Sequence, residues 1–322
     1  MKNLMISAAA FAAAFFAATE TGVDWAPSFN DAPVKPEDAK RIEEAVPAHA
    51  FARPAKSRKM LVYSATSGFR HKSIPHGKMA LEIIGKRTGA YEAVISDELT
   101  NFEPDNLKKF DAVCLLNVTG DFFLPHPKDL GTMEADRQQK LKENDLRLKK
   151  ALIEYVESGG GLVGIHSATD ACYQYEQYGD MVGGYFDGHP WTQDCRVTIR
   201  VEDPEHELTQ PVFKERSYSF PEEIYQFKEK PYSRERLRVL LNLDPEKSDK
   251  PKKEGSIKRT DNDFAVCWVQ KFGRGRVFYT SLGHREDIYM NPVMLGHYLA
   301  GIQFALGDLK ADTTPSAKLK RP

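Results

Sequence analysis

The segment GGGLVGIHSATD, residues 159–170, constrains the fold more than any other part of the chain. Its glycine-rich break is followed by the short apolar run Leu162 to Ile165, which is typical of a buried strand that ends in a turn. The order glycine, any residue, His166, any residue, small residue copies the spacing of a nucleophile elbow. In such an elbow a sharp strand-to-helix turn holds one reactive side chain above the sheet. Because that side chain is an imidazole here, the segment predicts a site without identifying its reaction.

Apolar runs separated by turn signals and amphipathic stretches lie on both sides of this segment. Strands that alternate with helices indicate βαβ units and a parallel sheet. The sequence therefore predicts an α/β fold whose second half is richer in strands. The predicted strands cover residues 59–66, 91–97, 110–117, 162–165, 195–203 and 237–244, with a hairpin over 264–280 and helices over 36–46, 74–88 and 292–306 and a long charged helix ending at residue 158.

Length and charge limit the function classes. A chain of 322 residues is long enough for one large α/β domain with a sizeable core. Its 45 basic and 46 acidic residues give a net charge of -1. No overall field therefore favours nucleic acid or an anionic membrane, and we expect neither as a partner.

The amino-terminal residues predict export. The apolar run Leu4 to Ala18 follows Lys2, and its length suits a secretory signal peptide better than a membrane span. The cleavage site is imperfect, because Phe15 and Phe16 stand where small residues are preferred. We expect a periplasmic or secreted protein with a signal peptide over 1–19, a polar leader over 20–57, one domain over 58–307 and a disordered tail over 308–322.

The four cysteines do not form a metal-binding pattern, because no two of them have Cys-x-x-Cys spacing. Cys114 and Cys267 lie in apolar runs and are expected in the core. Cys172 and Cys195 could form a disulfide in an exported protein, but spacing alone does not establish the geometry.

Polar residues follow several of the predicted strands. His71, Asn117, His166 and His284 each stand at or just past the carboxyl end of a strand. In open parallel sheets ligands bind outside those ends, so these four side chains are expected to converge. Asp170, one helical turn after His166, is expected at the same edge. The loop GGYFDGHPW, residues 183–191, adds His189 and Trp191.

Each of these residues also has a structural interpretation. His71 could cap the following helix, His284 could bond a backbone carbonyl and Asn117 could close a turn. Asp170 could be a helix-terminal charge that the helix dipole stabilises. Trp191 could be a packing residue, since aromatic side chains dominate cores. Three histidines at separate strand ends nevertheless favour a functional site.

Five motifs together resemble the ThuA-like (trehalose-utilisation) family: SGFRH at 67–71, GGGLVGIHSATD, GGYFDGHPW, EEIY at 222–225, and GRGRVFYTSLGH at 273–284. The resemblance covers roughly Lys59 to Gly307. It implies a flavodoxin-like, mostly parallel α/β fold related to class I glutamine amidotransferases, and a role in bacterial sugar or keto-sugar metabolism. The amidotransferases carry a cysteine at the elbow, where this chain has His166. Cys172 lies too far along to replace it, so amidotransferase chemistry is not expected.

Three functions stay open at this stage. In the first, a carbohydrate-active hydrolase or isomerase uses His166 and His71 as general base and acid, with Asp170 or Glu223 orienting one imidazole. In the second, His71, His166 and His284 bind a divalent metal such as zinc. The third is a non-catalytic carbohydrate-binding or scaffold domain. The expected substrate-binding residues are Asn117, His189, Trp191, Tyr225, Phe69 and Arg70, and the oligomeric state is not predicted.

Overall fold

The computed structural model describes residues 24–252 and 255–319 of the chain. The signal peptide expected over residues 1–19 lies outside the described residues. Within the described ranges, the search for membrane spans finds no helix that combines the required length and apolar character.

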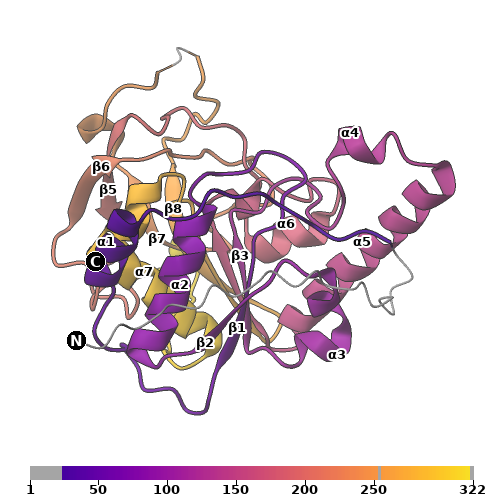
Figure 1. The fold of residues 1–322 in the computed structure, drawn as a ribbon. Coiled ribbons are helices and arrows are strands. Elements are labelled where there is room, and N and C mark those ends of the chain that lie inside the picture. Colours follow the sequence, from indigo (N-terminus) through magenta and orange to yellow (C-terminus); the bar gives the residue numbers. More distant parts are fainter. Residues whose placement is uncertain (1–23, 253–254, 320–322) are drawn as a thin grey trace, which may run out of the picture.

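A single mixed sheet of nine strands runs through the described part of the chain, in the order β2-β1-β3-β4-β9-β8-β7-β5-β6. Figure 1 shows the ribbon, in which β1, β2 and β3 lie near the helix α2 (Ile74–Thr88). The first five strands in this order pair in parallel, and the remaining four pairings are antiparallel. The α/β class is therefore confirmed, whereas a mostly parallel sheet is not. The strands are β1 (Lys59–Tyr63), β2 (Glu92–Ile95), β3 (Ala112–Leu116), β4 (Gly161–Ile165), β5 (Arg196–Val201), β6 (Ser217–Pro221), β7 (Arg238–Leu243), β8 (Ala265–Phe272) and β9 (Gly275–Thr280).

The change of direction comes from the hairpin between β8 and β9. A two-residue turn, Gly273 and Arg274, joins the two strands, as the sequence predicts. β9 also pairs in parallel with β4, so it belongs to both halves of the sheet. On the other side of β8, the strands β7, β5 and β6 extend the sheet as antiparallel neighbours.

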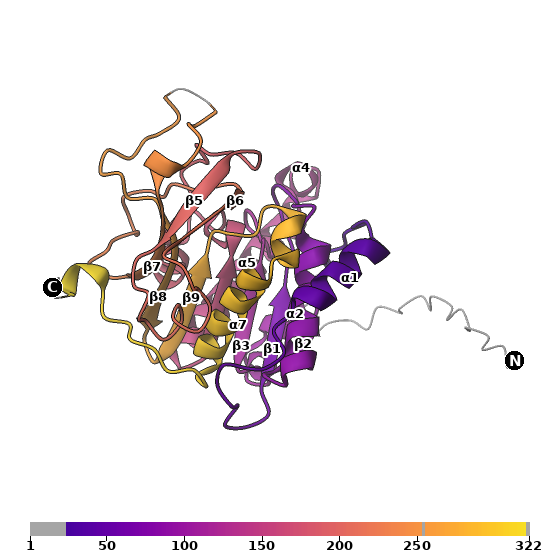
Figure 2. The ribbon, with the colours of Figure 1, turned by 90° about the vertical axis from the view of Figure 1, so that its left-hand side faces the viewer.

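Helices cover both faces of the parallel half (Figure 2). Successive residues of β1 alternate between two core clusters: Met60 and Val62 pack on one face, and Leu61 and Tyr63 on the other. The first cluster includes residues of α1, α2 and α7, and the second includes residues of α3, α5 and α6. The helices are α1 (Pro36–Ala45), α2 (Ile74–Thr88), α3 (Pro104–Leu107), α4 (Pro127–Leu130), α5 (Ala135–Glu157), α6 (Glu176–Val182) and α7 (Pro292–Leu306).

The glycine-rich break before β4 has a packing reason. Gly159 ends the turn after α5 with φ 119°, a backbone conformation that other residues rarely adopt. A Cβ on Gly161 would lie 2.3 Å from the carbonyl oxygen of Ala305, so only glycine lets α7 approach the start of this strand. The same local sequence that predicts a strand therefore also sets how closely α7 covers it.

The two chain ends pack against the domain within the described residues. In the leader, Ile42 of α1 is fully buried in the core, and Gln303 of α7 bonds the backbone of residues 51 and 52. The tail expected to be disordered is ordered over residues 308–319. The amide of Ser316 donates to the carbonyl of Leu237, and Asp308 forms an ion pair with Arg58. Backbone pairing orders this polar segment, which hydrophobic content alone does not predict.

Candidate functional site

His166 stands at a strained turn directly after β4. Its φ of 52° lies in the left-handed region, and a short 3-10 helix, His166–Thr169, begins at it. A non-glycine residue in this conformation is costly and is typical of functional sites. The elbow predicted from the glycine spacing is thus present. The hydroxyl of Tyr279 donates to the His166 carbonyl at 2.8 Å, which helps hold the turn.

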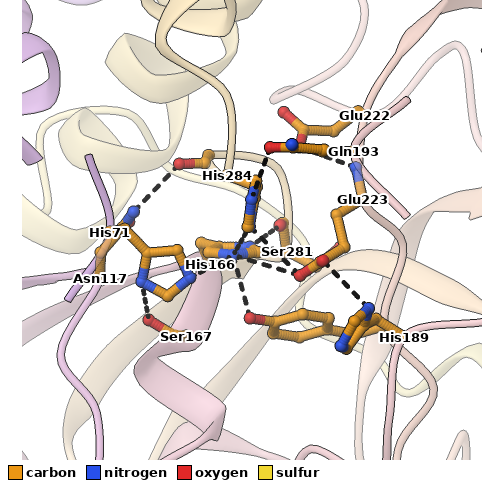
Figure 3. Close-up of polar contacts among 12 residues, drawn as sticks. His71, Asn117, His166, Ser167, His189, Gln193, Glu222, Glu223, Ser281 and His284 are labelled. Atoms are coloured by element: carbon orange, nitrogen blue, oxygen red, sulfur yellow. Dashed lines mark hydrogen bonds and ion pairs between the residues drawn. The ribbon is translucent and has the colours of Figure 1, made fainter. Parts of the chain in front are cut away.

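Two further histidines meet His166 above the carboxyl ends of the parallel strands (Figure 3). His71 follows β1, and its Nε2 lies 3.2 Å from Nε2 of His166. His284 follows β9, and its Nδ1 lies 3.2 Å from the same nitrogen. The predicted convergence of the three imidazoles is therefore observed. The strand-end argument succeeds because β1, β4 and β9 all belong to the parallel half.

The proton positions follow from the acceptors behind each ring. His166 Nδ1 lies 2.7 Å from the carbonyl oxygen of Ser281, which can only accept, so Nδ1 carries the hydrogen. Burial lowers the pKa of His166 to about 4 and that of His71 to about 2. His166 is therefore neutral near pH 7, and its Nε2 presents a lone pair to the other two rings.

Glu223 supplies the negative charge of the site. It follows β6 in the EEIY motif, and its carboxylate lies 3.0 Å from Nδ1 of His189, 3.3 Å from Nδ1 of His284 and 3.7 Å from Nε2 of His166. Burial favours a raised pKa for Glu223, but hydrogen bonds from His189 and His284 outweigh it and lower the pKa well below its usual range. The carboxylate in turn raises the pKa of His189 and, against the effect of burial, that of His284.

Tyr225 closes the site from the same segment. Its buried hydroxyl lies 2.9 Å from Nε2 of His166, and the two rings pack at a centroid distance of 4.6 Å. Burial raises the pKa of this phenol well above 10, so it stays protonated and can donate a hydrogen bond. Tyr225 therefore belongs to the site through its hydroxyl, and its ring is not an exposed platform.

Two of the three separations between the imidazole nitrogens match the spacing of ligands around a tetrahedral zinc ion. Zinc–nitrogen bonds of about 2.0–2.1 Å at tetrahedral angles place neighbouring ligand nitrogens about 3.3–3.4 Å apart. Both distances to His166 Nε2 are 3.2 Å, and all three ligand atoms lie within 4.8 Å of one another. The three histidines could therefore hold a metal ion, and the carboxylate of Glu223 and the hydroxyl of Tyr225 lie 3.7 Å and 2.9 Å from Nε2 of His166.

The outward nitrogens have acceptors of the kind that orient metal ligands. His166 Nδ1 contacts Ser281 O, His284 Nε2 lies 3.0 Å from Gln193 Oε1, and His71 Nδ1 lies 3.5 Å from Ser167 Oγ. Such partners set the tautomer of a ligating histidine and keep its other nitrogen free. Sequence reasoning missed Gln193, because an exposed glutamine in a loop carries no spacing signal.

Two of the expected site residues serve other purposes. The Nδ2 group of Asn117 donates to Ser73 Oγ at 3.1 Å and to Gly283 O at 3.0 Å, so it braces two loops beside the histidines. Asp170 accepts a hydrogen bond from Tyr173 at 2.6 Å. Glu223, the other carboxylate considered, is the one that contacts the imidazoles. The helical-turn argument fails for Asp170 because the turn after His166 is a 3-10 helix, which changes the direction of its side chain.

The aromatic residues of the predicted site divide by exposure. Trp191 is 1% exposed, packs edge-on against Phe264 and donates to the carbonyl of Asp249, so it is a core residue and not a sugar platform. Phe69 is 65% exposed and contacts the ring of His71 edge-on at 4.8 Å. Of the aromatic residues expected to bind substrate, Phe69 alone presents its face to solvent.

The cysteines lie outside this arrangement. Cys172 and Cys195 are both buried free thiols, so the disulfide considered from the sequence is not formed. Cys172 contacts the carbonyl of Gly120, and Cys195 contacts the hydroxyl of Thr192. Burial raises the pKa of the Cys172 thiol well above its usual value, which makes it a poor nucleophile.

The chain is thus an α/β protein with a buried imidazole at the turn after β4 and with three histidines gathered over the ends of parallel strands. The chain belongs to the ThuA family, described as trehalose utilisation, whose sequence model matches residues 59–305. A search of curated proteins found no match to the chain.

Two solved structures show the same fold. A ThuA-like protein from Bacteroides uniformis is 20% identical with a TM-score of 0.58, over 83% of this chain and 99% of that one. A second ThuA-like protein, from Parabacteroides merdae, is 15% identical with a TM-score of 0.50, over 80% of this chain and 93% of that one. At these identities the likeness is one of fold alone.

Proposed function

We propose that this ThuA-family protein is a carbohydrate-active enzyme of the hydrolase or isomerase type that binds a divalent metal, zinc foremost, at His71, His166 and His284. One observation carries the proposal: three buried or partly buried imidazoles bring one nitrogen each within 4.8 Å of one another, and two of these nitrogens lie 3.2 Å from the third. Three protein ligands with one remaining position are typical of catalytic zinc sites.

The surrounding groups suit chemistry on a hydroxyl or carbonyl. A bound metal would polarise a sugar oxygen or lower the pKa of a bound water. The carboxylate of Glu223 contacts Nδ1 of His189 at 3.0 Å and lies 3.7 Å from Nε2 of His166, so it could accept a proton from a group bound near the histidines. The protonated hydroxyl of Tyr225 can donate a hydrogen bond to an oxygen that gains negative charge.

The carbohydrate part of the proposal rests on the family and on Phe69. The family description concerns the use of trehalose. The exposed ring of Phe69 lies directly against His71, so a sugar face could stack on it while a hydroxyl reaches the histidines. His189, half-exposed and bonded to Glu223, lies on the solvent side of the same carboxylate and is a second candidate contact for a sugar hydroxyl.

One observation favours a second candidate, metal-free acid/base catalysis. Neighbouring imidazoles have opposite pKa shifts: burial lowers that of His166, whereas Glu223 raises that of His284 above its usual value despite burial. A base with a lowered pKa beside an acid with a raised pKa is an arrangement that proton-transfer enzymes use. In this mechanism His166 accepts the proton and His284, in place of the expected His71, donates it.

Metal content separates the two mechanisms. Protein purified without chelator should hold close to one equivalent of zinc by elemental analysis. His166→Ala and His284→Ala should lose it, while the control His49→Ala, which alters an exposed histidine of the leader, should retain it. Metal-free wild type, or a full complement of metal in His166→Ala, would contradict the metal site.

Measurement of turnover distinguishes the two enzymatic mechanisms from a non-catalytic binding domain. The purified protein is screened against oxidised and unoxidised disaccharides, with and without added zinc. Activity that survives chelation but is lost in His166→Ala would support the metal-free mechanism. Sugar binding that is unchanged in His166→Ala, with no conversion of any sugar, would indicate a non-catalytic carbohydrate-binding domain.

Export remains part of the proposal. The apolar run Leu4 to Ala18 supports a cleaved signal peptide and a periplasmic or secreted location. Amino-terminal sequencing of the protein recovered from the periplasm or medium of an expressing cell should find a new terminus near Thr19. Protein found only in the cytoplasm with Met1 intact would contradict export.

A further inference from the structure

A cavity of about 670 Å³ lies directly beside the histidine centre. His71 lines it, and so do Arg70 and Arg285, which are the sequence neighbours of His71 and His284. The leader, from Asn30 to Arg41, forms another part of its wall. That stretch precedes residues 59–305, which match the family. A segment outside the family domain therefore shapes the space next to the candidate metal site.

Two leader residues hold Arg70 in this wall. The Nε of Arg70 donates to Asp31 Oδ1 at 2.6 Å, and its Nη2 donates to the other oxygen of the same carboxylate. Its Nη1 donates to the carbonyl of Ser64 at 2.8 Å, and the ring of Phe29 lies 3.6 Å from the guanidinium carbon. This bidentate, stacked arrangement fixes the guanidinium plane. Arg70 and Asp31 nevertheless keep side-chain exposures of 18% and 26%, so a ligand can reach both.

A second pair repeats this arrangement on the same cavity. Arg285 donates from Nε and Nη2 to the two oxygens of Asp287, each at 2.8 Å. Within each pair the charges cancel, yet both pairs present fixed donors and acceptors. A phosphate or carboxylate would have to compete with Asp31 or Asp287 for the guanidinium groups. The lysines of the lining, Lys35 and Lys72, are exposed to solvent. A sugar hydroxyl can donate to the carboxylate and accept from the guanidinium without breaking either pair.

We propose that this cavity is a second subsite that binds a non-ionic sugar unit next to the unit at the histidine centre, and that Asp31 positions Arg70 within it. The preferred substrate is then a glycoside of at least two units, and the leader determines that preference. This inference rests on the proposed function for the identity of the neighbouring unit. It adds that residues outside the family domain select the substrate.

The test compares affinities for one and two sugar units. Calorimetry measures binding of glucose, trehalose and cellobiose to the zinc-loaded full chain. We expect at least one disaccharide to bind more tightly than glucose. Asp31→Ala should weaken the binding of that disaccharide by about 10- to 100-fold, because charged hydrogen bonds are lost. The same variant should leave the affinity for glucose almost unchanged. Asp31→Glu should restore part of the loss, and Asp24→Ala, which alters an exposed leader carboxylate outside the cavity, should have no effect.

Several results would overturn the subsite. Equal loss for glucose and disaccharide in Asp31→Ala would show that Asp31 acts through the fold as a whole. No loss for either sugar would show that Asp31 does not contribute to sugar binding. Asp31-dependent binding of glucuronate or inorganic phosphate would contradict a non-ionic sugar unit at the subsite. If no sugar in the panel binds, the subsite and the carbohydrate role both fail. Zinc content, measured on the same samples, distinguishes the two proposals. If Asp31→Ala selectively loses affinity for the disaccharide while the protein holds no zinc, the result supports the subsite and refutes the metal site.

Discussion

Gln193 offers a sensitive test of the proposed metal site, because its side chain contacts one of the proposed ligands, His284, from outside the site. Its Oε1 accepts a hydrogen bond from Nε2 of His284 at 3.0 Å, which leaves Nδ1 of His284 directed at the other imidazoles. Loss of such an outer partner typically costs 10–100-fold in metal affinity. Gln193 is exposed, so water can replace the lost acceptor. We therefore expect Gln193→Ala to lower the zinc affinity by the smaller of these factors, about 10-fold, which corresponds to about 1.4 kcal/mol of binding free energy.

The matched variant Gln193→Glu sharpens the test. A carboxylate accepts the same hydrogen bond and raises the basicity of the imidazole, so this variant should bind zinc at least as tightly as the wild type. Competition against a chromophoric zinc chelator at neutral pH measures all three affinities. The reasoning is refuted if Gln193→Ala binds zinc as tightly as the wild type, or if Gln193→Glu binds it more weakly than Gln193→Ala.

Three further predictions concern the scaffold. Burial lowers the pKa of His297 to about 3, so stability is lost as the pH falls from about 6.5 toward 3, by at most about 1.4 kcal/mol per pH unit. His297→Gln should flatten this slope in denaturant titrations, and an unchanged slope would contradict the assignment. Lys149→Met leaves buried Asp145 without its partner at 2.7 Å and should destabilise the fold by about 3–5 kcal/mol, which the added change Asp145→Leu should largely recover. A Cβ on Gly301 would lie 2.4 Å from the Phe278 ring, so Gly301→Ala should cost about 1–3 kcal/mol, and an unchanged melting temperature would show that the ring moves freely.

Local sequence signals were sufficient for the elements of the parallel half and for the hairpin. The run Leu162 to Ile165 is apolar throughout, as a strand buried on both faces requires, and the elbow spacing located the left-handed turn at His166. The carboxyl ends of parallel strands share one edge of the sheet, so the sequence alone predicts that the histidines after three strands converge.

The antiparallel half could not be predicted in the same way. An apolar run shows that a strand is buried, but not which neighbour it pairs with or in which direction. The pairing of β5 with β7 and β6 depends on loops of differing length and on contacts far apart in the sequence. The expectation of a mostly parallel sheet extended the pattern of the first half to strands whose partners the sequence does not specify.

Some residues of the site could likewise be predicted from the sequence, and others could not. The residue types at strand ends were evident from the sequence, which is why His71, His166 and His284 could be named as a possible metal site. The choice of Glu223 over Asp170, the role of Gln193 and the burial of Trp191 depended on where loops fold back over the sheet. Short-range periodicity and turn chemistry determine which segments become strands and where a strand ends. Side-chain contacts between loops depend on long-range packing, which no local pattern encodes, so only the tertiary structure decided them.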